Sequence, residues 1–139
     1  MLKGISPLIS PQLLKTIAEM GHGDEIVIGD ANFPAKSLNP NNIRADGHGV
    51  VELLDAILAL LPLDTYVEAP VTLMAVPDGQ EKPAIWESFT KTIEKHQKDI
   101  KYQYVDRMAF YELSKKAYAT VATGERALYA CIILKKGVI

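Results

Sequence analysis

Apolar residues recur at helical spacing in separate stretches of this chain, and shorter apolar runs lie between those stretches. Leu13, Ile17 and Met20 share one face of a predicted helix. Ser10 suits the N-cap of that helix, and Pro11 suits its first position because the proline ring already has a helical φ. The same spacing predicts helices over residues 11–20, 50–61, 83–95 and 106–118.

Short apolar runs between the helices predict the strands of a sheet. Residues 71–76 are almost entirely apolar, which is typical of a central strand covered on both faces. Residues 31–42 are rich in Asn, Pro and Ser and are predicted to form a surface loop, held in place by a buried Phe33. Predicted strands cover residues 25–29, 71–76, 101–105, 119–122 and 129–134, with a short extended segment at 43–46.

Helices and strands that alternate this regularly indicate an α/β protein, specifically a three-layer α/β/α sandwich with a mixed central sheet. The length of 139 residues suits one domain over residues 1–139. A net charge of -2 predicts no broad attraction for nucleic acid. The single cysteine, Cys131, cannot form an internal disulfide and suits a reducing compartment. No secretory signal is visible, and helix 50–61 is too short to span a bilayer, so we expect a cytoplasmic protein with no membrane partner.

One histidine, His22, lies between Gly21 and Gly23, where the first predicted helix gives way to the first strand. Histidine can give and take a proton near neutrality, and the flanking glycines leave its ring uncrowded. A catalytic acid/base is therefore one interpretation of His22. The other is a histidine that only stabilises the end of a helix through the helix dipole. His48 and His96 are expected to be solvated.

Two further polar residues occupy positions where ligands often bind. Asp30 follows the first predicted strand at its carboxyl end, where α/β sheets bind ligands, although a loop aspartate can simply stabilise a turn. Arg107 falls in the first turn of a predicted helix, where a cation opposes the dipole by roughly 0.3–1 kcal/mol. An ion pair, or a ligand oxygen held by the guanidinium, would offset that cost. Tyr129 has a hydroxyl that suits a polar ligand or any buried partner.

Several well-known site motifs are absent. The tripeptide around His22 lacks the third glycine of a dinucleotide fingerprint and precedes a strand instead of following one. The chain has neither a GxxxxGK phosphate loop nor a nucleophile elbow. A metal site from His22, Asp24, Asp30 and His48 stays open by residue type, but their spacing matches no known ligand set. We therefore expect acid–base chemistry on a small polar molecule, without a metal or cofactor.

A set of short segments spans nearly the whole chain and carries a more specific signal. In order, they are residues 2–11, 20–26, 30–35, 43–47, 63–66, 107–112, 123–125 and 134–138. Any one of them is weak, but their order and spacing together are specific. Taken together they resemble the fucose mutarotase branch of the ribose pyranase/fucose mutarotase family. Segment 107–112 is closer to the fucose branch than to the ribose branch.

The resemblance implies a single sugar mutarotase domain that acts on L-fucose or a related monosaccharide, with His22 as the catalytic acid/base. It implies a homo-oligomer, a decameric ring whose sites form near subunit contacts. Members of the family usually carry Asn where this chain has Cys131, and a thiol is a weaker hydrogen-bonding group than an amide. The residues implied in binding the sugar are Asp30, Arg107, Tyr129, Ala130 and Cys131.

Mutarotation adds a proton to the ring oxygen of the sugar and removes one from its anomeric hydroxyl. We expect His22 to protonate the ring oxygen while water or Tyr129 accepts the anomeric proton, with His22, Asp30 and Arg107 in one pocket. Three alternatives stay open: a D-ribose pyranase-type isomerase, a sugar-binding protein without turnover, and a structural or assembly role.

Overall fold

The computed structural model describes residues 1–139. The first helix begins as the sequence predicts, because the Ser10 hydroxyl accepts a hydrogen bond from the Leu13 N–H at 3.1 Å and Pro11 takes the first helical position. The elements in chain order are α1 (Pro11–Glu19), β1 (Glu25–Gly29), α2 (Ala35–Leu38), β2 (Asn42–Ala45), α3 (Val50–Leu58), β3 (Val71–Met74), α4 (Ile85–His96), β4 (Tyr102–Val105), α5 (Arg107–Lys116), β5 (Ala119–Thr123) and β6 (Ile132–Lys135).

The strands form one six-stranded mixed sheet in the order β2-β5-β1-β6-β3-β4. β6 is antiparallel to its neighbours β1 and β3, and every other pair of neighbours is parallel. All the strands except β6 therefore end at one side of the sheet, where β6 begins. We call that side the carboxyl edge, and the opposite side, where β1 and β3 begin and β6 ends, the amino edge.

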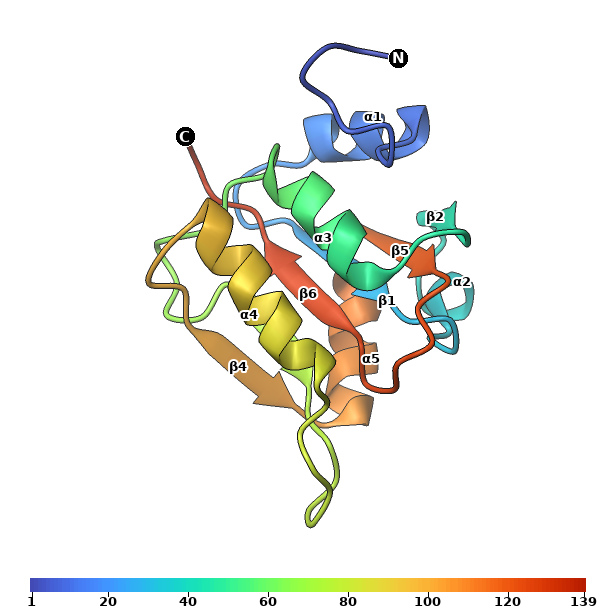
Figure 1. Ribbon diagram of the computed structural model, residues 1–139, viewed down its shortest axis with the longest axis vertical. Coiled ribbons are helices and arrows are strands. Elements are labelled where there is room, and N and C mark those ends of the chain that lie inside the picture. The colour runs from blue at the N-terminus through green and yellow to red at the C-terminus, as the bar shows by residue number, and fades with distance from the viewer.

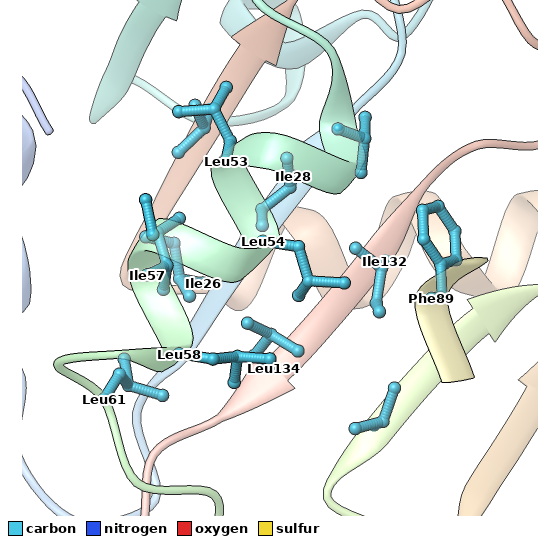
Figure 2. Close-up of a cluster of buried hydrophobic side chains, with 14 of the residues drawn as sticks. Ile26, Ile28, Leu53, Leu54, Ile57, Leu58, Leu61, Phe89, Ile132 and Leu134 are labelled. Carbon is cyan, nitrogen blue, oxygen red and sulfur yellow. The ribbon is translucent and has the colours of Figure 1, made fainter. Parts of the chain in front are cut away.

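Helices cover both faces of the sheet (Figure 1). α3 and α4 lie across one face with α1 beside them, and α5 lies behind the sheet with α2. Leu54 of α3, Phe89 of α4 and Ile132 of β6 belong to the larger buried cluster (Figure 2). Phe110 of α5 and Cys131 belong to a smaller cluster on the other face. Each large apolar side chain buried in these clusters stabilises the fold by about 1.5–3 kcal/mol. The predicted three-layer α/β/α sandwich with a mixed sheet is confirmed.

Two predictions about residues 31–61 were wrong in detail. The predicted loop 31–42 contains the one-turn helix α2, in which the Asn39 N–H donates to the Ala35 carbonyl at 3.1 Å. Phe33 is buried beside it, as expected, and packs edge-on against Phe110. α3 ends at Leu58 and not at residue 61. The last residues tighten into a turn because the position before Pro62 disfavours helical backbone.

The last strand also begins later than the sequence predicts, at Ile132 and not at Tyr129. Tyr129 has a φ of 56°, in the left-handed region, so it cannot continue an extended strand. This turn leaves Tyr129, Ala130 and Cys131 just ahead of β6, at the carboxyl edge. No helix combines the length and apolar character needed to cross a membrane.

Candidate functional site

The carboxyl edge of the sheet collects most of the residues that the sequence singled out. Asp30 follows β1, Tyr129 and Cys131 precede β6, and Arg107 follows β4. The antiparallel register pairs Ile28 with Ile132, so continuing it by two residues places Asp30 opposite the start of the β6 segment. These residues therefore lie at the same side of the sheet although they are far apart in the sequence.

Arg107 lies beside an open hollow and has no ion pair within the chain. It is the first residue of α5, and the Asp106 side chain caps that helix by accepting from the Ala109 N–H at 2.8 Å. The hollow has a volume of about 670 Å³ and is lined by Arg107, Tyr129, Met108 and the segment that follows β3. The ion-pair interpretation of Arg107 is wrong, and its guanidinium is free to bind a ligand oxygen.

The backbone of Tyr129 is held in its left-handed turn from the α4 side. The Trp86 indole Nε1 donates a hydrogen bond to the Tyr129 carbonyl at 3.2 Å. Trp86 itself is buried and packs against Tyr104, with ring centroids 5.4 Å apart. A left-handed conformation at a non-glycine residue costs roughly 1–3 kcal/mol and persists only where neighbouring contacts hold it. The contact from Trp86 is one of these, and it fixes the backbone that carries Tyr129 at the hollow.

Cys131, two residues after Tyr129, forms a buried polar pair with Asp30. The Cys131 Sγ lies 3.5 Å from Oδ2 of Asp30, whose other oxygen accepts from the Asn32 N–H at 2.9 Å. Burial raises the pKa of the Cys131 thiol well above its ordinary value, and the adjacent Asp30 carboxylate raises it further. Cys131 is therefore a neutral thiol near pH 7, able to donate a weak hydrogen bond to Asp30.

His22 lies at the other side of the sheet, so one chain by itself does not bring His22, Asp30 and Arg107 into one pocket. The turn after His22 pairs with the end of β6, through a hydrogen bond from the Gly23 N–H to the Lys136 carbonyl at 2.8 Å. Asp30 lies beside the start of that strand. The whole length of β1 thus separates the imidazole from the carboxylate, because a strand is an extended, inflexible connection.

At the amino edge, His22 has partners that the sequence did not predict. Its Nε2 lies 3.1 Å from Oδ1 of Asp64, and its ring meets the Tyr66 ring edge-on with centroids 5.2 Å apart. The His22 side chain is 40% exposed, whereas the Asp64 side chain is only 4% exposed. The imidazole therefore reaches solvent while a buried carboxylate holds it.

The carboxyl group of Asp64 stays ionised in this setting. Its pKa lies below the ordinary value, chiefly because the Tyr66 backbone N–H donates to Oδ1 at 2.9 Å. Burial opposes this effect, and the hydrogen bond with His22 lowers the pKa further. Asp64 belongs to segment 63–66 of the family resemblance, but nothing in its local sequence points to His22. Only the pairing of that segment with the end of β6, where the turn after His22 also pairs, brings the two together.

The other two histidines lie beside carboxylates of the same chain. His96 is not solvated as expected, because its Nε2 lies 2.6 Å from Oδ1 of Asp55 and its side chain is 19% exposed. His48 is more open and lies 3.6 Å from Glu52. The four residues considered for a metal do not assemble, and no group of three or more His, Cys, Asp or Glu side chains is placed to hold a metal ion.

Comparison with known proteins gives a consistent result over nearly the whole chain. A sequence model of the RbsD / FucU transport protein family matches residues 3–139. The L-fucose mutarotase of Actinobacillus pleuropneumoniae serotype 5b (strain L20) is 54% identical over 140 residues, which cover 99% of this chain and 97% of that protein. The fucose mutarotase of Homo sapiens is 48% identical over 145 residues, which cover 99% of this chain and 94% of that protein.

A solved structure matches the fold equally closely. The crystal structure of the fucose mutarotase from Streptococcus pneumoniae in complex with L-fucose superposes with a TM-score of 0.96. It is 55% identical in sequence, and the match covers 99% of both chains.

Proposed function

The chain belongs to the RbsD / FucU transport protein family, and we propose that it is an L-fucose mutarotase, an isomerase that interconverts the α and β anomers of the free sugar. The observation that carries this proposal is the match to a fucose mutarotase solved with L-fucose, at 55% identity over 99% of both chains. The TM-score of 0.96 shows that the two proteins also share the fold. We propose that residues 1–139 act as one mutarotase domain.

The proposed reaction needs one group that exchanges a proton and others that orient the sugar. His22 gives a proton to the ring oxygen, while water or Tyr129 accepts the proton of the anomeric hydroxyl. The ring opens to the aldehyde, the bond next to the carbonyl carbon rotates, and the reverse transfers close the other anomer. Asp30 and Arg107 bind the sugar hydroxyls, and the 129–131 segment forms the adjoining wall. The proposal uses no metal or cofactor.

This mechanism calls for two copies of the chain at each site, because one chain holds His22 and Arg107 at opposite edges of its sheet. We propose a homo-oligomer in which the amino edge of one subunit closes the carboxyl edge of another. Exposed apolar side chains at both edges support this arrangement. They are Tyr66 and Val67 at the amino edge, and Tyr104, Met108 and Leu128 at the carboxyl edge.

We propose that the oligomer is the decameric ring implied by the family resemblance, and that it works in the cytoplasm on a free monosaccharide, without nucleic acid or membrane. Light scattering measures the mass of the assembly directly. A monomer at micromolar concentration would contradict the shared site, since no single chain then brings the proposed groups together.

Saturation-transfer NMR on L-fucose tests the activity, because it measures exchange between the two anomers at equilibrium. The parent protein should accelerate that exchange, and the His22→Asn variant should not. A matched control is His48→Asn, which removes a histidine whose side chain is 40% exposed and lies 3.6 Å from Glu52. If the His22→Asn protein is as fast as the parent, His22 has no part in the reaction.

A panel of sugars separates the alternatives. Anomer exchange faster with D-ribose than with L-fucose would identify a ribose pyranase-type isomerase. Tight binding of L-fucose without accelerated exchange would identify a sugar-binding protein, an outcome that Cys131 in place of the usual Asn would favour. Neither binding nor exchange would leave a structural or assembly role.

A further inference from the structure

The Cys131 side chain is buried among apolar groups and does not line the hollow at the carboxyl edge. It is only 2% exposed and belongs to the smaller cluster, which also contains Phe33 and Phe110. Tyr129, two positions earlier, does line the hollow. A sugar in the hollow therefore contacts this segment at Tyr129, while the sulfur of Cys131 stays covered by the protein.

The pairing of β1 with β6 explains why Cys131 is buried on this face. Val27 of β1 lies opposite Ile133 of β6, and both belong to the smaller cluster. Side chains two positions apart along a strand share a face, so Cys131 follows Ile133 and lies opposite Gly29. The Phe33 ring packs so closely over Gly29 that a Cβ there would overlap it. A small and largely apolar group such as a thiol suits burial at this position.

The one hydrogen-bond partner of this thiol is Asp30. The Sγ of Cys131 lies 3.5 Å from Oδ2 of Asp30, and the other oxygen, Oδ1, accepts from the Asn32 N–H at 2.9 Å. Burial raises the pKa of the thiol, so the thiol keeps its proton and is the donor. An ionised carboxylate has about four acceptor sites. These two donors leave a further site on each oxygen for the hydroxyls of a sugar.

We propose that Cys131 is a positioning residue for the sugar-binding carboxylate: its thiol holds Asp30 and does not itself contact the sugar. This inference rests on the proposed function, in which Asp30 binds sugar hydroxyls. The thiol and the Asn32 N–H hold one oxygen each, so the orientation of the carboxylate is fixed before the sugar binds. A group that is already oriented loses less conformational freedom on binding. The replacement of the usual Asn by Cys131 then affects the sugar only through Asp30.

Infrared spectroscopy of the S–H stretching vibration tests this hydrogen bond without measuring activity. Cys131 is the single cysteine of the chain, so the band has one source. A charged acceptor forms a stronger hydrogen bond than a neutral amide and lowers the S–H frequency more. We expect the band of the parent at a lower frequency than the band of Asp30→Asn. The matched control Asp55→Asn, which alters a carboxylate beside His96, should leave the band in place. Equal frequencies in the parent and Asp30→Asn would overturn the proposal.

Two substitutions of similar size separate the loss of the donor from the loss of the sulfur atom. Cys131→Ala and Cys131→Ser both leave space in the cluster, but only Ser has a hydroxyl that can donate to Asp30. We expect Kd for L-fucose, measured by calorimetry, to rise roughly 2- to 12-fold in Cys131→Ala, as for the loss of one hydrogen bond. Cys131→Ser should bind the sugar almost as tightly as the parent. Equal affinities of the two variants, whether or not they match the parent, would overturn the proposal.

Together the two measurements distinguish a failure of this inference from a failure of the proposed function. A parent that shows the lowered S–H band but neither binds L-fucose nor exchanges its anomers would contradict the proposed function, and the positioning role with it. An active parent whose Ala variant binds as tightly as its Ser variant would contradict the role of Cys131 alone. Circular dichroism shows whether both variants are folded. If Cys131→Ala does not fold, the infrared comparison of the parent with Asp30→Asn still decides the question.

Discussion

The separation of His22 from Arg107 predicts how mixed oligomers behave. β1 has five residues, which at about 3.4 Å per residue span roughly 17 Å between the two edges of the sheet. One monosaccharide cannot contact both edges of the same chain at that distance. Two inactive variants, one altered at each edge, should therefore complement each other when they assemble together.

The suitable variants are His22→Asn and Arg107→Gln. Removing the acid/base should lower the exchange rate on the order of 10²- to 10⁴-fold. If the guanidinium makes a hydrogen bond to the sugar, its removal should cost about 1.5–3 kcal/mol of interaction energy with the sugar. The exchange rate should then fall roughly 10- to 150-fold. Arg107 has no ion pair in the chain, so its replacement leaves the fold undisturbed. In a co-assembled oligomer, a site is active when its amino edge comes from an Arg107→Gln subunit, which keeps His22. Its carboxyl edge must then come from a His22→Asn subunit, which keeps Arg107.

Random assembly of equal amounts of the two variants makes roughly a quarter of the sites competent. The co-assembled protein should accordingly regain about a quarter of the parent rate, far above either variant alone. Co-expression with two different affinity tags and purification through both gives the mixed oligomer, and saturation-transfer NMR on L-fucose gives its rate. Separately purified variants, combined just before the measurement, are the control. A mixed oligomer no faster than this control would refute the argument from the two edges.

Three further predictions concern stability. Phe89→Ala should lower the free energy of unfolding by about 3–5 kcal/mol in denaturant titration, because it opens a cavity in the fully buried larger cluster; an unchanged midpoint would contradict that packing. Ser10→Ala should lower it by about 0.5–2 kcal/mol through loss of the N-cap of α1, whereas Ser10→Asp should keep most of the parent stability. The pKa of Asp55 is lowered, first by the hydrogen bond from Lys95 and then by His96, so its contribution to stability is present above the unfolded pKa of about 3.9 and is lost as the pH falls through the lower folded value. The parent should therefore lose stability relative to Asp55→Asn between about pH 5 and 3, and parallel pH curves for the two proteins would contradict the pairing.

Local signals in the sequence were sufficient to predict most of the helices and strands and the chemical character of several residues. Ser10-Pro11 specified the start of α1, and the spacing of apolar residues specified the face that α3 buries, because both depend on neighbours within a few positions. The position of Arg107 in a first turn also indicated that the residue needed a partner beyond the helix. The structure leaves its guanidinium unpaired at the hollow.

The order of the strands and the meeting of distant side chains were decided only by the tertiary structure. Nothing near His22 in the chain reveals that β6 lies antiparallel beside β1, or that Asp64 packs against the imidazole from 42 residues away. The left-handed turn at Tyr129 likewise depends on Trp86, which lies on another element. Periodicity and capping reflect interactions between residues close in sequence, whereas the placement of a residue at one edge of a sheet or the other depends on how whole strands pair.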